Sequence, residues 1–175
     1  SPYAKINISF NPAGSPTSLT IAKNTKFTST INGIAYTFCT TTSTFIPRSS
    51  IGTYVATGIK INEGKILNKA YTVNGSDATQ RYIIPNLNVD TTTIRVKVQK
   101  SITDSDVDSY TDGNSIDITT IKGTDKVYFL QEVEDKKYEI IFGDGAIGKQ
   151  LSDGNIIFIE YIITSGSVAN FASTF

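Results

Sequence analysis

Three aspartates in an acidic stretch are the first residues whose spacing suggests chemistry. Asp104, Asp106 and Asp108 are spaced like the first three ligands of an EF-hand calcium loop. The pattern then breaks, because Ser109 stands where the loop needs glycine and Ser115 where it needs glutamate. No flanking helices are evident. The sequence favours a solvated acidic loop, with a calcium loop of another type as the minor alternative, and no metal ligand is predicted.

A glycine-rich run formally matches the G-x-G-x-x-G pattern of dinucleotide sites. The run extends from Gly143 to Gly148. A dinucleotide site needs a helix that opens at this loop within a βαβ unit. Only residues 149–152 precede the next turn at Asp153-Gly154, and no helix of useful length fits there. We therefore expect these glycines to form turns between strands, and no cofactor is predicted.

Catalysis has few candidate residues in this chain. The sequence contains no histidine, which excludes Ser-His-Asp, Cys-His and histidine–zinc mechanisms built from its own residues. Two carboxylates alone can hydrolyse a glycoside, but most of the candidates lie at outward positions of alternating stretches. These candidates are Glu132, Glu134, Asp135, Glu139, Asp144 and Glu160. The single cysteine, Cys39, can form no internal disulfide and is expected to be a buried, inert thiol. No catalytic residue is predicted, and we expect that the protein is not an enzyme.

Composition narrows the choice of partners. The 175 residues include sixteen basic and sixteen acidic side chains, a balance that argues against a dedicated nucleic-acid binder. No apolar run approaches the ~20 residues that a membrane-spanning helix needs, so we expect a soluble chain. Because it starts at Ser1-Pro2 and contains no methionine, we expect it to be a segment of a longer protein. Nucleic acid, membrane and small-molecule substrates are not among the predicted partners.

The elements that must position these residues are predicted to be strands. Threonine, isoleucine and valine are abundant, and such β-branched side chains favour a pleated backbone. Apolar and polar residues alternate in Thr93–Lys100, as in a half-buried strand. They also alternate on both sides of Asn32-Gly33, which predicts a two-residue hairpin over 26–38. A second hairpin is predicted over 138–163. Helix is expected only as a short turn, near 48–51 or within the final ten residues.

These elements predict an all-β fold. Mainly antiparallel hairpins are expected to form a β-sandwich or a distorted barrel-like pair of sheets, as a single domain over 1–175. Residues 101–117 are expected to form the exposed acidic loop. The stretch Asn155–Thr164 is apolar on both faces, which predicts a strand that is covered twice. The favoured interpretation is a central strand of the same domain, and the alternative is a strand that faces a partner chain.

The glycine-rich run also carries a resemblance. Residues 138–148 read Tyr-Glu-Ile-Ile-Phe-Gly-Asp-Gly-Ala-Ile-Gly, and an Asp-Gly-Asn at 153–155 opens the next strand. This pattern resembles the large baseplate wedge subunit of T-even-type contractile-tailed phages and, more distantly, baseplate J-like proteins. The likeness extends from about Ile8 to Asn170. The residues that carry the motif, as turns and as a possible interface, are Tyr138, Phe142, Gly143, Asp144, Gly145, Gly148, Asp153, Gly154 and Asn155.

The resemblance implies a structural role in a virion. Members of that family join neighbouring wedge proteins and their own copies to build a ring around the central hub. The resemblance therefore implies such partners, a location in the tail baseplate and assembly in the host cytoplasm. It carries over no catalytic residue. An alternative stays open, namely a receptor- or carbohydrate-binding β module of a tail fibre or adhesin. Such a module would use exposed tyrosines as stacking platforms. The candidates are Tyr54, Tyr71, Tyr82 and Tyr110.

Overall fold

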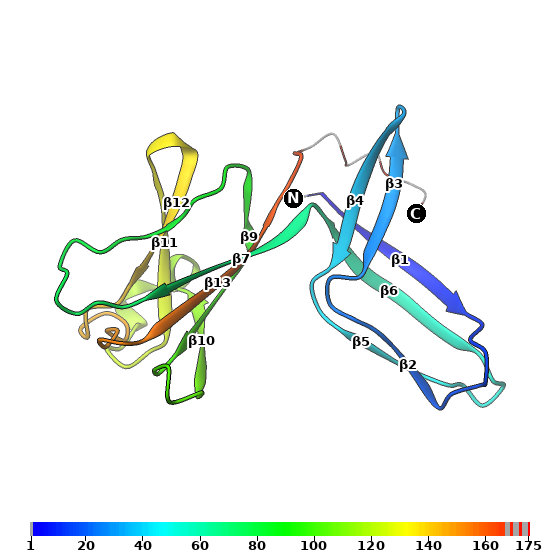
Figure 1. Cartoon of the computed structure of the whole chain (residues 1–175), viewed down its shortest axis with the longest axis horizontal. Coiled ribbons are helices and arrows are strands. Elements are labelled where there is room, and N and C mark those ends of the chain that lie inside the picture. The colour runs from blue at the N-terminus through cyan, green and yellow to red at the C-terminus, as the bar shows by residue number, and fades with distance from the viewer. Residues whose placement is uncertain (1, 167–168, 170–171, 173–174) are drawn as a thin grey trace. The chain divides into compact units, whose positions relative to one another are not determined.

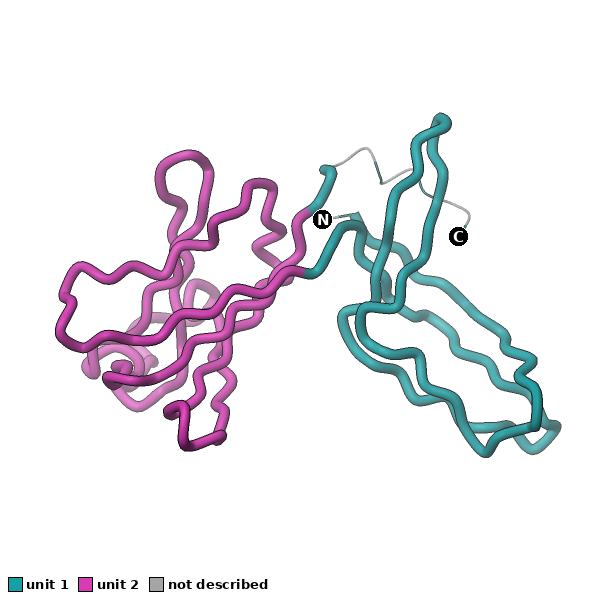
Figure 2. Tube along the Cα trace, in the orientation of Figure 1, with its two compact units in different colours: residues 1–66, 164–175 teal, residues 67–163 magenta. Residues whose placement is uncertain are grey.

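The chain divides into two compact units, which Figure 2 distinguishes. The structure is a computed structural model that describes residues 2–166, 169, 172 and 175. Unit 1 comprises residues 1–66 and 164–175, and unit 2 comprises residues 67–163. The chain therefore leaves unit 1 once, completes unit 2 and then returns. Whether residues 1–175 fold as a single domain, as the sequence predicts, stays a prediction.

The described residues of unit 1 form six strands (Figure 1). They are β1 (Tyr3–Phe10), β2 (Ser18–Ile21), β3 (Lys26–Ile31), β4 (Ile34–Thr40), β5 (Thr44–Pro47) and β6 (Tyr54–Glu63). Four of them form an antiparallel sheet in the order β1-β6-β4-β3, and β2 pairs with β5. The predicted hairpin over 26–38 is confirmed, since Ile31 pairs with Ile34 across a two-residue turn. Asn32 and Gly33 both have positive φ angles, 50° and 80°, as a type I′ turn requires.

The core of unit 1 lies against one face of the four-stranded sheet. Alternation along β4 and β6 turns Phe38 and Ile61 inward, where both are almost fully buried. Ala169 packs into the same cluster, so the returning chain contributes to this core. Near Arg48, the expected short turn is a hydrogen-bonded turn between Ser49 and Thr53. Most of the final ten residues lie outside the described part of the chain.

Unit 2 contains seven strands and three short 3-10 helices. The strands are β7 (Lys65–Thr72), β8 (Tyr82–Ile84), β9 (Val89–Gln99), β10 (Val107–Asp112), β11 (Val127–Val133), β12 (Lys137–Phe142) and β13 (Ile156–Ile163). The helices are η1 (Gly113–Ser115), η2 (Ile118–Thr120) and η3 (Glu134–Lys136). All seven strands form one sheet in the order β7-β13-β9-β10-β11-β12-β8. The pairs β9–β10, β9–β13, β11–β12 and β8–β12 are antiparallel, and β10 and β11 form a short parallel contact. The predicted all-β class is confirmed.

The predicted hairpin over 138–163 is wrong. β12 pairs with β11 and β8, whereas β13 pairs with β9 and lies between β7 and β9. Residues 143–155, which connect β12 to β13, are hydrogen-bonded to the loop 122–125. The chain therefore enters a different part of the sheet. The apolar stretch 155–164 does form an inner strand. Ile157 and Ile159 are fully buried, but Phe158 on the opposite face is 40% exposed.

A strand also forms where the sequence analysis expects an acidic loop. Within 101–117, β10 pairs with β9 over four residues, and Tyr110 turns inward with 7% of its surface exposed. Its other residues are polar or exposed, so the stretch shows no apolar alternation that would reveal a strand. One buried aromatic ring and the open edge of β9 are sufficient to recruit this polar segment into the sheet.

Candidate functional site

The loop that follows β12 is organised around one carboxylate. Asp144 Oδ1 accepts hydrogen bonds from the backbone amides of Ala146 and Ile147, each at 2.9 Å. The amides of Ile147 and Ala146 hold the pKa of Asp144 below its usual value. The amide of Gly145 donates to the carbonyl of Gly148 at 3.0 Å. The carboxylate is thus used inside the loop, as in other Asx turns.

A second loop packs directly against this one. The amide of Gly148 donates to the carbonyl of Lys122 at 3.1 Å, and the amide of Lys149 donates to that of Asp125 at 2.7 Å. A Cβ on Gly123 would lie 1.9 Å from the carbonyl oxygen of Gly145, and one on Gly143 would lie 2.2 Å from the carbonyl carbon of Gly148. Only glycine fits at position 123, where the two loops meet, and at position 143, where the loop after β12 folds back on its own backbone. Sequence reasoning did not identify Gly123 or Asp125, because no turn pattern links them to the motif.

The Asp-Gly-Asn part of the motif joins three strand ends. Asp153 Oδ1 accepts from the amide of Gly75 at 2.8 Å, just beyond β7. The amide of Gly154 donates to the carbonyl of Val73 at 2.9 Å. The side-chain amide of Asn155 donates to the carbonyl of Lys100 at 2.8 Å, just beyond β9. These three residues therefore fix the start of β13 between its two neighbours.

Phe142 lies within a chain of aromatic rings. Its ring meets Tyr82 edge-on at a centroid distance of 5.8 Å and Tyr110 at 5.4 Å. Tyr82 in turn meets Tyr71 at 5.6 Å. Edge-to-face contacts of this kind add to the stability gained from burial. The other aromatic residue of the motif, Tyr138, is half-buried in β12 between Glu132 of β11 and Ile84 of β8.

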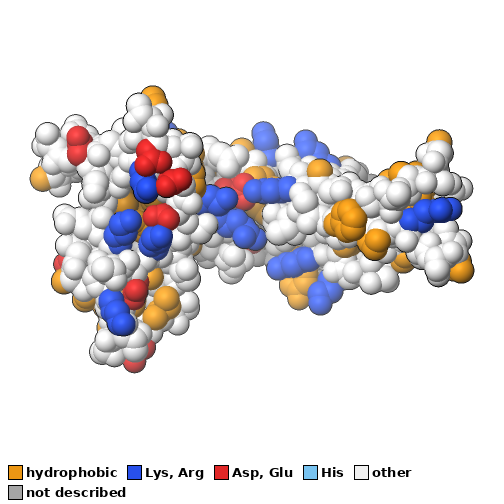
Figure 3. Space-filling view, turned by 90° about the horizontal axis from the view of Figure 1, so that it is seen from below, with side chains coloured by type: hydrophobic (Ala, Val, Ile, Leu, Met, Phe, Trp, Pro, Cys, Tyr) orange, Lys and Arg blue, Asp and Glu red, His pale blue; other side chains and the backbone are white. Residues whose placement is uncertain are grey.

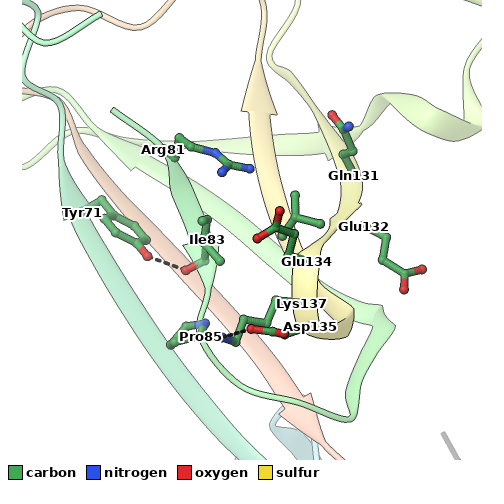
Figure 4. A pocket seen from close by; sticks show the side chains of 10 residues that line it. Tyr71, Arg81, Ile83, Pro85, Gln131, Glu132, Glu134, Asp135 and Lys137 are labelled. Atoms are coloured by element: carbon green, nitrogen blue, oxygen red, sulfur yellow. Dashed lines mark hydrogen bonds and ion pairs between the residues drawn. The ribbon is translucent and has the colours of Figure 1, made fainter. Parts of the chain in front are cut away.

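The two edge strands of the sheet are joined by a side chain. The hydroxyl of Tyr71 on β7 donates to the carbonyl of Ile83 on β8, as Figure 4 shows. Burial raises the pKa of Tyr71 above its usual value. Because β7 and β8 stand at opposite ends of the strand order, this bond brings the ends of the sheet together. The sheet is thereby almost closed into a barrel.

A shallow pocket of about 540 Å³ lies beside this bond (Figure 4). Its rim is charged: Arg81 binds Glu139 through two hydrogen bonds of 3.0 and 2.6 Å, and Lys137 lies 3.5 Å from Asp135. The hydrogen bonds that Arg81 donates to Glu139 raise the pKa of Arg81. These charges are used in ion pairs, and the lining combines them with Ile83 and other apolar groups. We see no arrangement of nucleophile and base in this pocket.

The aspartates considered as calcium ligands form ion pairs with lysines, and the carboxylates considered for hydrolysis lie apart from one another. Asp104 and Asp106 form ion pairs with Lys100, at 3.4 and 2.8 Å. Asp108 binds Lys126 at 2.7 Å, and this hydrogen bond lowers the pKa of Asp108. The candidates for glycoside hydrolysis are spread over β13, the loop after β12 and the β11–β12 end of the sheet. Among the described residues, no group of three or more metal-binding side chains is arranged to hold an ion.

The remaining predicted residues fall mostly in the core. Cys39 is buried with its sulfur 3.7 Å from the carbonyl oxygen of Gly64, as expected for an inert thiol. The prediction of exposed tyrosine platforms is wrong for Tyr54 and Tyr110, which are only 3% and 7% exposed. Both rings are large apolar groups on inward-facing strand positions, where burial is favourable. No helix in the described part of the chain is long and apolar enough to cross a membrane.

The strands and loops define an all-β protein whose motif residues bind backbone groups of unit 2. The family model for the bacteriophage baseplate wedge protein gp6, third domain, matches residues 66–166, which is more than half of the chain. The chain therefore belongs to this family, and it is a structural component of a phage tail baseplate. The matched range coincides closely with unit 2. No curated protein matches the sequence.

Proposed function

We propose that this chain helps to build the baseplate ring around the tail hub through protein–protein contacts and that it catalyses no reaction. The observation that carries the proposal is the family match over unit 2. The internal use of the motif residues supports it, since Asp144, Asp153 and Asn155 all bind backbone groups of their own unit. The expected partners are other wedge proteins and further copies of the chain, assembled in the host cytoplasm. Nucleic acid, membrane and small-molecule substrates are not expected to bind.

The loop after β12 is the contact element that we favour within unit 2. Residues 144–147 are exposed, and Ile147 shows 40% of its surface to solvent. The backbone of the loop is held by Asp144 and by the neighbouring loop 122–125. Because the loop backbone is already fixed, it loses little conformational freedom when a partner binds, and the entropy cost of association is small. An exposed apolar side chain on such a rigid support is well suited to a protein interface.

The proposal is tested by placing charge on this loop in the protein as it is expressed during assembly of contractile-tailed particles. The variant Ile147→Arg is compared with Ile102→Arg, which alters a more exposed isoleucine away from the motif. We expect Ile147→Arg to block incorporation into baseplates, measured by electron microscopy of contractile-tailed particles, and Ile102→Arg to assemble normally. Both variants should keep the circular dichroism spectrum of the native protein. Normal assembly of Ile147→Arg would contradict the role of this loop.

The location is tested independently by immunogold electron microscopy. An antibody raised against this chain should label the baseplate of particles that carry the parent protein. Label at the tips of tail fibres would instead favour a receptor-binding module.

A further inference from the structure

The two units differ in charge although the whole chain is neutral. Unit 1 contains six basic side chains and one acidic side chain, a net charge of +5. Unit 2 contains ten basic and fifteen acidic side chains, a net charge of −5. In Figure 3 the acidic side chains gather over unit 2, and the surface of unit 1 displays lysine and arginine without them. The family match covers unit 2, so it does not account for this property of unit 1.

The basic side chains of unit 1 include a group on the outer face of the four-stranded sheet. Lys5 of β1 lies directly opposite Lys60 of β6. The Nζ of Lys60 also lies 4.7 Å from the centre of the Tyr3 ring, and that ring is 59% exposed. These residues share a face because directly opposed residues of an antiparallel pair point to the same side, as do residues two apart on one strand.

Lys26 points to the same side of the sheet, where it is separated from Tyr3 by the buried residues Cys39 and Asn62. It pairs with Cys39, which pairs with Asn62, which pairs with Tyr3, and each of these pairs shares a side of the sheet. We call the surface formed by Tyr3, Lys5, Lys26 and Lys60 the basic face. The other exposed positions nearby, such as Thr28 and Thr37, are uncharged.

Nothing acidic in unit 1 offsets the basic face. The single carboxylate, Glu63, is buried with 2% of its surface exposed and accepts hydrogen bonds from Thr164 and Ser165. Like charges that lie directly opposite each other on neighbouring strands are destabilising. The pairing of Lys5 with Lys60 therefore costs stability in the isolated unit, and an acidic surface bound to this face would remove that cost.

We propose that the basic face binds the acidic unit 2 of a second copy of the chain, an inference that rests on the proposed function. The opposite and equal charges of the two units favour this occupant. Glu132 and Glu134, near the exposed turn between β11 and β12, are the carboxylates that we assign to the contact. Both carboxylates are exposed, and Glu134 lies close enough to Arg81 to contribute to the raised pKa of that side chain. Nucleic acid is less favoured, because the basic face offers one exposed aromatic ring and no row of stacking platforms.

The contact has a consequence for symmetry. It joins different surfaces on the two copies, so the arrangement is heterologous, and repeated heterologous contacts close into rings or continue as filaments. The attraction is also electrostatic at the surface, where salt at 0.1 M screens charges over about 10 Å. Self-association through this face should therefore weaken as the salt concentration rises.

The test uses two charge-reversed variants of the complete chain. In K5E/K60E the basic face becomes acidic, and in E132K/E134K the acidic surface becomes basic. Sedimentation velocity at low salt should show self-association of the wild type that is roughly tenfold weaker or absent in each variant alone. An equimolar mixture of the two variants should associate again, because each reversed surface then meets a complementary one.

A control keeps the change in net charge the same. K97E/K122E reverses two exposed lysines of unit 2 and should associate like the wild type. A wild type that stays monomeric at low salt, or a mixture of variants that stays monomeric, overturns the inference. Salt-dependent binding of DNA that K5E/K60E abolishes, without self-association, would assign the basic face to nucleic acid instead. Baseplate incorporation of the wild type, measured separately, keeps the proposed function distinguishable from this contact.

Discussion

At the scale of single residues, the motif of this family acts through its backbone. Gly123 and Gly148 allow two loops to touch, and Gly143 allows the first loop to fold back on itself. Asp144 accepts hydrogen bonds from two amides of the first loop. These residue types would suit catalysis or nucleotide binding in another setting. Here their polar groups form hydrogen bonds within unit 2, so the motif residues stabilise the loops of this unit.

The close approach of Gly143 to Gly148 within the loop after β12 predicts a large effect of one added methyl group. Gly143→Ala would place a Cβ 2.2 Å from backbone atoms of Gly148, which a rotamer change cannot relieve. We expect a loss of about 2–4 kcal/mol in the free energy of unfolding of unit 2, measured by denaturant titration. Gly154→Ala is the matched control. Gly154 has a φ of 78° but open space around it, so only strain of about 1 kcal/mol is expected. Equal losses in the two variants would contradict the steric explanation.

Ionisable residues predict how stability depends on pH. Hydrogen bonds lower the folded-state pKa of Asp144, and of Asp77 and Asp117 in other turns, below the usual 3.8. The folded state thus binds fewer protons, so this contribution is present above pH 3.8 and is lost as the pH falls through the folded pKa. The chain has no histidine, and the melting temperature should stay nearly constant from about pH 5 to 8. Asp144→Asn should reduce the loss in acid; an unchanged profile would count against this assignment.

A complementary loss is expected in alkali. Burial raises the pKa of Tyr128 to about 12, compared with 10.0 in the unfolded chain. The folded state therefore keeps a proton that the unfolded state releases, and stability falls as the pH rises from about 10 to 12. Melting curves of the wild type and of Tyr128→Phe over this range provide the measurement. The variant should lose less stability on going from pH 9 to 11 than the wild type does.

At the scale of elements, the structure shows which strands a sequence can reveal. The hairpin over 26–38 follows from local alternation and from Asn32-Gly33, so it could be predicted. β10 could not, because Tyr110 alone faces the core among polar neighbours. The pairing of β13 with β9 rather than with β12 could not be predicted either. It depends on contacts of Gly148 and Lys149 with the loop 122–125. Non-local pairings of this kind leave no pattern in the strand itself.

The hydrogen bond between the two edge strands of the seven-stranded sheet is expected to stabilise β8. Tyr71→Phe removes the hydroxyl that joins β7 to the carbonyl of Ile83 on β8. We expect a loss of about 1 kcal/mol in stability and faster amide hydrogen exchange in β8. Tyr138→Phe is the control, because the hydroxyl of Tyr138 has no hydrogen-bond partner among the described residues. If exchange in β8 is unchanged by Tyr71→Phe, the side-chain bond does not hold the sheet edges together.

At the scale of the whole molecule, unit 2 is an insertion within unit 1. The chain enters unit 2 after Ile66 and returns at Thr164, and Glu63 holds the returning segment. Its carboxylate accepts from the Thr164 hydroxyl at 2.6 Å and from the Ser165 amide at 3.0 Å. A buried carboxylate in this position therefore brings the outgoing and the returning chain together.

We expect that removal of the Glu63 carboxylate increases local opening of the segment 164–166. Glu63→Ala leaves the donors of Thr164 and Ser165 without their acceptor, at a cost of about 2–3 kcal/mol. Hydrogen exchange at the Ser165 and Gly166 amides should accelerate, with β3 and β4 less affected. Glu63→Gln keeps one acceptor oxygen and should show a smaller effect. Similar exchange rates in Glu63→Ala and the wild type would refute the role of Glu63.

The inserted arrangement also governs the order of events during synthesis. Unit 1 contains Ala169 in its core, so the ribosome must make all of unit 2 before unit 1 can be completed. If unit 2 is still unfolded at that time, closing unit 1 means joining the ends of a long flexible loop, and the entropy cost grows with the length of the loop. The hydrogen bond between Glu63 and Thr164 joins the two segments of unit 1 that flank unit 2, so a folded unit 2 acts as a short connection. The inserted unit is thus the natural first step of folding, and a substitution that weakens it delays the maturation of the unit that encloses it.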